Sequence, residues 1–292
     1  MILKHFLLAL ALVPPCLACD LQEKKPADPS TTKADSRFTG QLLPGLEALD
    51  PKVADDGTGS APKGAMPSPI APPVKELPRQ GVRWGGVLSQ SALFLAVEQG
   101  YRLGTQPGTR EALKGPFFDD WFKAVKATKG WGDGDDFLAN YIGHPMQGSV
   151  TGFIFAQNDP AGIRQEFGRS SKYWKSRLNA MAWSAFYSVQ FELGPISEAS
   201  IGNVGYHGGS QSGAVDLVVT PLAGFGWQVG EEALDKYLIQ KIETRTRNPV
   251  VLMLVRSFLN PTRSFANLMR GSVPWSRDTR PGIWGSNRTA HK

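Results

Sequence analysis

Hydrophobic positions between residues 81 and 271 recur at the three- and four-residue spacing of an α-helix, and no stretch there alternates convincingly like a β-strand. This pattern predicts helices at residues 87–101, 174–193, 214–243, 249–259 and 261–271, and one helix or two at 109–128, where Pro116 interrupts the pattern. About 190 residues are enough to bury a single core. We therefore expect a mainly α fold, a compact multi-helix bundle with proline-kinked helices, as one domain over residues 81–271 that follows a disordered linker.

Particular residues mark where these helices begin and bend. Pro221 lacks an amide donor and should kink the helix at 214–243. Asn-Pro pairs at positions 248–249 and 260–261 should each open a helix, because asparagine caps free amide groups and proline fits the first turn. Asp133 or Asp135 should cap the helix that contains the next group of residues.

The segment from residue 131 to residue 148 concentrates polar chemistry in one expected helix. Asp136, Asn140 and His144 stand four residues apart in it, so neighbours in that series could share a ligand. Asp136 and His144 are about 12 Å apart along the axis and cannot chelate one ion by themselves. Pro145 also disfavours the α conformation at His144.

Three carboxylates elsewhere are expected to face inward. Counting 100° per residue places Glu231 within an apolar stripe of its helix, and Asp216 shares that face if the bend at Pro221 is modest. Glu192 lies on one face with mainly apolar and small residues of the helix at 174–193. Buried carboxylates are costly unless they are paired, protonated or bound to an ion. We therefore expect an internal polar cluster.

Two interpretations of this cluster stay open. In the first, histidine and inward acids bind a metal ion or transfer protons. The catalytic candidates are then His144, Asp136 and Glu192, the other cluster members are Asn140, Asp216 and Glu231, and the candidate metal ligands are His144 and Glu231. In the second, the carboxylates accept hydrogen bonds in a structural network. No paired Glu-x-x-His or His-Glu-x-x-His motif occurs, so the cofactor stays unknown.

Residues 1–19 have the pattern of a signal peptide. Lys4 supplies a positive charge, residues 6–13 form an unbroken apolar run, and small residues precede Cys19. The apolar run is too short to span a bilayer, which takes about 20 residues. Either the chain is cleaved after Ala18 in the ordinary way, or Cys19 becomes the lipidated first residue of a lipoprotein. In both cases the protein is expected to be exported.

Residues 20–80 are expected to form a disordered, proline-rich linker. Ten of the 22 prolines fall in this stretch, and Phe38 is its only aromatic residue. Such a composition cannot bury enough apolar surface to offset the entropy of ordering it. Both cysteines, Cys16 and Cys19, precede the stretch, so the helical domain must be held together by core packing without disulfides.

Positive charge is concentrated at the carboxyl end. Residues 248–292 carry seven basic side chains and one acidic one, a net +6 that equals the formal charge of the whole chain. We expect residues 272–292 to be a basic flexible tail, which either lies on an anionic membrane or another polyanion or is simply solvated. The candidate contact residues are Arg263, Arg270, Trp275, Arg277, Arg280 and Trp284. Nucleic acid is not an expected partner, because no binding motif occurs.

A set of motifs in a fixed order resembles a known bacterial family. The motifs are Asp136-x-x-x-Asn140-x-x-x-His144-Pro145-x-x-Gly148, Glu192, Asp216 to Pro221 with Gly224, Gly230-Glu231, and Asn260-Pro261-x-Arg263 with Arg270-Gly271. Over about residues 130–271 this set resembles the family called domain of unknown function 3943. The resemblance implies an envelope-associated helical domain and no established reaction.

These observations predict an exported protein of the bacterial cell envelope, on the periplasmic side and either lipid-anchored or free. The first hypothesis is a structural protein that contacts membrane lipid or envelope proteins. The alternative is a metal-dependent or acid/base hydrolase that acts on an envelope substrate through His144 and the inward carboxylates. An integral membrane bundle is disfavoured, because the apolar stretches at 178–191 and 215–229 are short and contain polar residues. The oligomeric state is not predicted.

Overall fold

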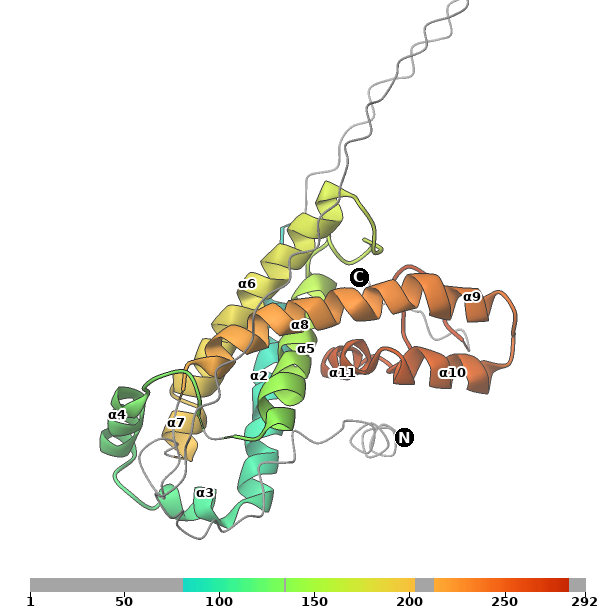
Figure 1. Ribbon diagram of the computed structural model, residues 1–292. Coiled ribbons are helices and arrows are strands. Elements are labelled where there is room, and N and C mark those ends of the chain that lie inside the picture. The colour runs from blue at the N-terminus through green and yellow to red at the C-terminus, as the bar shows by residue number, and fades with distance from the viewer. Residues whose placement is uncertain (1–80, 134, 203–212, 284–292) are drawn as a thin grey trace, which may run out of the picture. The chain divides into compact units, whose positions relative to one another are not determined.

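The computed structural model describes residues 81–133, 135–202 and 213–283, and within these ranges it contains helices and no strands (Figure 1). The prediction of a mainly α, multi-helix fold is therefore confirmed. The predictions about the signal peptide, Cys19, the linker and Trp284 concern residues outside the described ranges. None of the helices in those ranges is both long enough and apolar enough to cross a bilayer.

The expected helices are present in order, and the structure adds α7 and continues the expected polar helix beyond residue 148. The helices are α2 (Trp84–Thr105), α3 (Pro107–Ala112), α4 (Phe117–Ala127), the π-helix η1 (Ala139–Gly143), α5 (His144–Asn158), α6 (Ser171–Leu193), α7 (Glu198–Ile201), α8 (Val215–Leu234), the π-helix η2 (Asp235–Ile239), α9 (Gln240–Glu243), α10 (Pro249–Phe258) and α11 (Pro261–Met269). Because η2 and α9 continue α8, the predicted helix at 214–243 is present almost residue for residue.

Helix α5 is the element around which the others pack. Every residue of α5 except Met146 is buried, and the helix contacts α2, α6, α8 and α11 (Figure 1). Its Phe153 and Ile154 lie in a core that includes Phe94 of α2 and Tyr187 of α6. A helix that is covered on all sides needs small side chains among its large ones, because the small ones allow neighbouring helices to approach closely.

Two glycines let α5 and α8 cross with their backbones in contact. A Cβ atom added to Gly148 of α5 would lie 1.9 Å from the carbonyl oxygen of Thr220 in α8. A Cβ atom added to Gly224 would lie 2.8 Å from the Cα of Gly148. No side chain fits between the two helices at this point. The crossing therefore fixes how the first turns of α5 and α8 face each other.

The prolines inside the helical segments are accommodated without a break in the chain's helical course. At the start of α5 the amide of His144 donates to the carbonyl of Ala139, five residues back, so η1 is a widened turn just before Pro145. Such π-turns are frequent at functional sites. Pro221 lies inside α8, as the sequence predicted, and the helix continues on both sides of it.

Of the two Asn-Pro helix starts, only the first is capped by its own asparagine. The side chain of Asn248 accepts hydrogen bonds from the amides of Val250 and Val251 at the start of α10. The side chain of Asn260 makes no such bond at the start of α11. Other acceptors from α8 take its place, as described below. The prediction of a second asparagine cap is therefore wrong.

The prediction of a flexible tail beginning at residue 272 is wrong for residues 272–283. Trp275 and Arg277 are buried, and the side-chain amide of Asn267 donates to the carbonyls of Pro274 and Ser276. Arg277 also donates to the carbonyl of Arg256 in α10. This segment is part of the helical domain.

The arginines that were candidates for membrane or polyanion contact form internal ion pairs instead. Arg277 and Arg280 both pair with Asp235, Arg263 pairs with Glu232 and Asp235, and Arg270 pairs with Asp278. Burial alone would raise the pKa of Asp235, but Arg263, Arg277 and Arg280 hold it well below its usual range. The sequence did not reveal these pairs, because basic residues predominate after residue 248 and most of their acidic partners lie earlier in the chain, on α8, η2 and α9.

Candidate functional site

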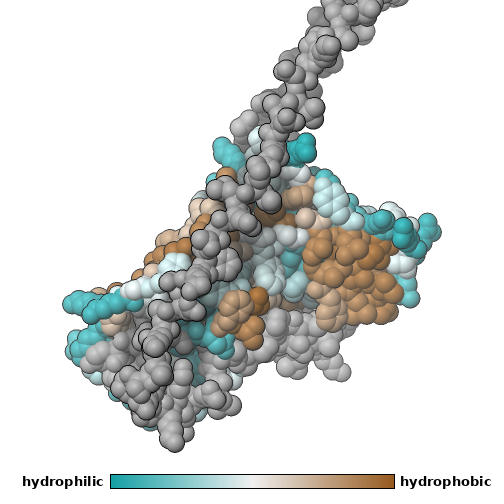
Figure 2. All heavy atoms as spheres, viewed as in Figure 1, coloured by the Kyte–Doolittle hydropathy of each residue, from teal (hydrophilic) through white to brown (hydrophobic). Residues whose placement is uncertain are grey.

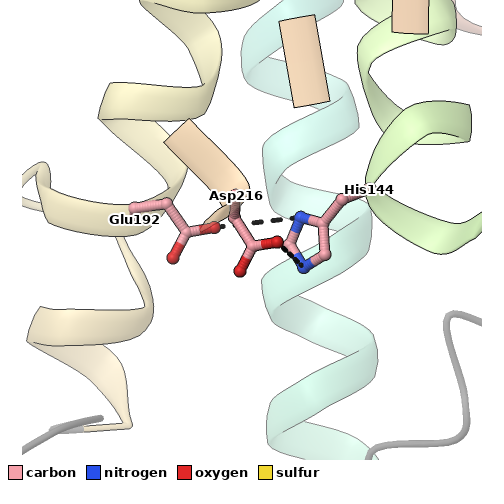
Figure 3. A group of neighbouring side chains, drawn as sticks. All are labelled: His144, Glu192 and Asp216. Carbon is pink, nitrogen blue, oxygen red and sulfur yellow. Dashed lines mark ion pairs between the residues drawn. The ribbon is translucent and has the colours of Figure 1, made fainter. Parts of the chain in front are cut away.

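Three side chains from three helices meet near one end of the crossing between α5 and α8. His144 is the first residue of α5, Glu192 lies in the last turn of α6, and Asp216 lies in the first turn of α8. Figure 3 shows the imidazole of His144 facing both carboxylates. Its Nδ1 is 3.9 Å from Oε1 of Glu192, and its Nε2 is 3.6 Å from Oδ1 of Asp216. The sequence had named all three residues as members of an internal cluster.

Local contacts position the imidazole of His144 and the backbone at the start of α8. Thr220 lies one turn after Asp216 on α8, and its hydroxyl is 3.4 Å from Nδ1 of His144. The hydroxyl of Ser188 on α6 donates to the backbone carbonyl of Asp216 at 3.0 Å, which ties the end of α6 to the start of α8. The ring of Phe191 packs edge-on against the imidazole.

The cluster is not a closed hydrogen-bond network. The two distances between His144 and the carboxylates are longer than hydrogen bonds, which extend to about 3.2 Å. Oε1 of Glu192 and Oδ1 of Asp216 are buried, and neither accepts a hydrogen bond from any residue in the described ranges. By contrast, both oxygens of the buried Glu232, at the other end of α8, accept bonds from Arg177. Unsatisfied buried oxygens cost free energy and point to a missing partner.

Burial and neighbouring acids shift the proton equilibria of all three groups. Burial, followed by the charges of Glu198 and Asp216, raises the pKa of Glu192 well above its usual value. Burial, together with a hydrogen bond to Asp133 and the charge of that residue, raises the pKa of Asp216 to about 9. Burial lowers the pKa of His144, although Glu198 and Asp133 oppose the shift. Without a cation, the negative charges of the cluster are therefore suppressed by bound protons.

Asp133 is a site residue that sequence reasoning missed. Its Oδ1 accepts hydrogen bonds from the amide of Asp135 and the side chain of Asn140, both at 2.9 Å, and its carboxyl group shares a hydrogen bond with Asp216. Burial would raise its pKa, but the bonds with Asp216 and Asn140 lower it. The sequence suggested Asp133 only as a helix cap, because the contact with Asp216 depends on a loop approaching another helix.

Asp136 and Asn140 do not join the three facing side chains. The carboxylate of Asp136 accepts from the amide of Ala139 at 2.8 Å, so it caps this helix in place of the expected Asp133 or Asp135. Asn140 supports Asp133 and does so from one turn before His144. The position of Asp136 does not support its prediction as a catalytic group, because its carboxylate accepts a hydrogen bond from a backbone amide.

The predicted metal pair of His144 and Glu231 is wrong. Glu231 is buried, and its two oxygens accept from the amides of Thr262 and Arg263 at 2.9 and 3.1 Å, so it caps the start of α11. Fifteen residues of helix place it about 22 Å along the axis from Asp216. Glu231 does point inward, as its angle around the helix predicts. That angle could not give the height along the helix at which each carboxylate meets a neighbour.

A further carboxylate, partly buried, lies close to α5 but is satisfied. Glu98 of α2 accepts from the hydroxyl of Tyr187 at 2.6 Å and from the side chain of Gln147 at 3.0 Å. Burial raises its pKa to about 8, even though both hydrogen bonds act in the opposite direction. No sequence signal separated Glu98 from the exposed polar residues of α2.

The three facing side chains supply a set of metal-binding atoms. One nitrogen of His144 and one oxygen each of Glu192 and Asp216 all lie within 4.8 Å of one another. Two atoms that each lie about 2.1 Å from one ion can be at most about 4.2 Å apart, so small side-chain movements would complete the coordination. Within the described part of the chain, this is the one such group of three ligands.

Comparison of the chain with family models, with curated proteins and with solved structures finds no match. The similarity to domain of unknown function 3943 consequently stays a prediction from the motifs.

Proposed function

We propose that this chain binds a divalent transition-metal ion through His144, Glu192 and Asp216 and uses it in a metal-dependent reaction at the bacterial cell envelope. The observation that carries the proposal is the pair of buried carboxylate oxygens, on Glu192 and Asp216, that face the same imidazole and accept no hydrogen bond from any described residue. A bound cation would satisfy both oxygens and replace the protons that otherwise suppress their charge.

The chemistry of the ligands favours zinc or a similar metal. One imidazole with two carboxylates suits zinc, manganese or iron, whereas magnesium and calcium prefer oxygen ligands alone. Three protein ligands leave a fourth position for water, which is the arrangement of catalytic rather than structural zinc sites. Asp216 would give up its proton on binding the ion, so Asp133 would keep its hydrogen bond to this ligand only by taking that proton. The set therefore supports hydrolysis by a metal-activated water, the alternative that the sequence left open.

The location in the envelope rests on the sequence. The signal-peptide pattern at residues 1–19 and the similarity to domain of unknown function 3943 both support export. We propose Cys19 as the attachment point for lipid if the chain is processed as a lipoprotein. Zinc-dependent chemistry is compatible with this compartment, since the helical domain has no cysteine to be oxidised.

Metal content measured by mass spectrometry tests the proposal. The chain from residue 20, purified and exposed to zinc and then dialysed, should retain one zinc ion per molecule. His144→Ala and Asp216→Asn should each abolish this retention while circular dichroism shows an unchanged helix content. Glu111→Gln, which removes an exposed carboxylate from α3, is the matched control and should retain the metal.

A stability measurement covers the case in which a variant folds poorly. Zinc at 100 times its Kd should stabilise the parent chain by about 2.7 kcal/mol, and it should not stabilise Asp216→Asn. Absence of zinc binding by the parent chain would refute the proposal. Equal retention of zinc by His144→Ala and Asp216→Asn would assign the metal to another site.

A further inference from the structure

Helix α10 presents an apolar face to the outside of the domain. Val250, Val251, Leu254 and Phe258 are 50, 38, 44 and 56% exposed. At 100° per residue these four positions fall within about 100° of one another, so they share one face of α10. Figure 2 shows hydrophobic side chains gathered on the right of the view, where α10 lies in Figure 1. We call these four residues the α10 face.

The opposite side of α10 is firmly attached to the domain. Arg256 is buried, its Nε donates to Glu243 at 2.7 Å, and its guanidinium also reaches the carbonyl of Trp275. The helix cannot turn its apolar residues inward without breaking the ion pair of Arg256. The α10 face is therefore a fixed outer surface of the domain.

Cationic side chains flank the α10 face. The chain from Thr244 to Arg277 contains no acidic residue. Of the arginines in this stretch, those at positions 256, 263, 270 and 277 are held in internal ion pairs. Arg245 and Arg247, in the loop that leads into α10, are exposed and have no ion pair with any described residue. An apolar helix face beside exposed cations is complementary to an anionic lipid surface.

The exposed aromatic side chains of α4 lack this complementarity. Phe118 and Phe122 are exposed, but the exposed Asp119 lies between them in the chain. Negative charges of this kind repel an anionic surface. The α10 face is also too small for a stable dimer, which buries about 800 Å² on each partner. Four side chains that are each about half exposed supply less than that.

We propose that the α10 face, with Arg245 and Arg247, docks the helical domain onto an anionic phospholipid surface. The apolar side chains would enter the boundary between headgroups and acyl chains, and the two arginines would lie among the phosphates. This proposal moves the predicted lipid contact from the carboxyl-terminal arginines, which are paired internally, to α10. It is independent of the metal site at His144. A lipid at Cys19, if present, would strengthen the contact by keeping the domain near a bilayer.

Vesicle co-sedimentation of the chain from residue 20 tests the proposal. The chain should bind vesicles of equimolar phosphatidylglycerol and phosphatidylcholine, and it should bind vesicles of pure phosphatidylcholine much more weakly. Leu254→Ser should weaken binding at least about tenfold, because it removes apolar area from the inserted face. Leu222→Ser is the matched control, since Leu222 is similarly exposed but lies on α8, and it should bind as the parent does.

Two double variants test the electrostatic contribution to vesicle binding. Arg245→Gln combined with Arg247→Gln should weaken binding about 25-fold. Lys172→Gln combined with Lys175→Gln, on exposed positions of α6, makes the same change in net charge and should leave binding nearly unchanged. Equal losses in both double variants would mean non-specific attraction and would overturn the proposal. So would an absence of vesicle binding, or a concentration-dependent dimer in sedimentation that Leu254→Ser dissociates, since that would assign the face to a second copy.

Discussion

Replacing Gly148 with alanine should destabilise the fold, although alanine is the better helix former. The new Cβ atom would lie 1.9 Å from the carbonyl oxygen of Thr220, well inside van der Waals contact. This oxygen belongs to the backbone of α8, so it cannot rotate away as a side chain would. Helices α5 and α8 would have to separate, and the packing of the most buried helix of the domain would loosen with them.

The magnitude follows from two opposing terms. Overpacking a core costs about 1–3 kcal/mol and occasionally more, and a clash between two helix backbones belongs at the upper end. In a helix interior, alanine is more favourable than glycine by about 1 kcal/mol, which opposes this cost. We therefore expect Gly148→Ala to lower the free energy of unfolding by about 2 kcal/mol or more. Zinc affinity should fall too, because His144 lies one turn before Gly148 and its position depends on the same crossing.

Gly226 provides a matched control for this prediction. It lies in α8, it is exposed, and an added Cβ atom would meet nothing within 4 Å. Gly226→Ala should therefore stabilise the protein by up to about 1 kcal/mol. Urea denaturation followed by circular dichroism measures both variants. Unchanged stability of Gly148→Ala, or a similar loss in the two variants, would refute the argument from close backbone approach.

Two further predictions concern Glu231 and Glu98, carboxylates outside the metal cluster. Glu231→Gln should cost about 1–3 kcal/mol in urea denaturation and leave zinc retention intact, because the charge-assisted bonds to the amides of Thr262 and Arg263 are weakened. Glu98→Gln should gain stability relative to the parent as the pH rises, since the folded-state pKa of Glu98 is raised from 4.5 to about 8. The stability that protonated Glu98 contributes is complete below its unfolded pKa and is lost as the pH rises through about 8, whereas glutamine stays neutral.

Each of these two predictions has a clear contrary result. Loss of zinc from Glu231→Gln would return Glu231 to the list of ligands and contradict its assignment as a helix cap. A stability difference between Glu98→Gln and the parent that does not change with pH would show that Glu98 titrates alike in the folded and unfolded chains.

Interactions within a few residues made the helices predictable. The segment 214–243 has an apolar stripe with helical period, and it is helical from Val215 to Glu243. The cap at Asn248 was predictable for the same reason, because its acceptor and donors are two and three residues apart. The cap of α11 was not. Its acceptor is Glu231, which lies some thirty residues earlier in the chain and reaches α11 only after the helices pack.

The candidate site was predictable in part. Helical periodicity placed Glu192 and Asp216 on inward faces, and both meet His144 in the structure. The same argument gave Glu231 an inward direction but could not separate it from the cluster. An angle around a helix follows from residue numbers alone, whereas the partner at a given height depends on where the helices cross. Asp133 was missed because it approaches the cluster from a loop, for which no periodicity exists.

The sequence by itself determined the helical class, most helix ends other than those of α5, the polar segment at 131–148 that leads into α5, and the inward direction of three acids. These properties depend on backbone hydrogen bonds and on side chains three or four residues apart, which are local. Tertiary structure alone decided which acid joins His144, which arginines are paired and which remain exposed beside α10. Those outcomes depend on the crossing at Gly148 and Gly224. They also depend on contacts between residues far apart in the sequence, which replace contacts with water only when the helices pack.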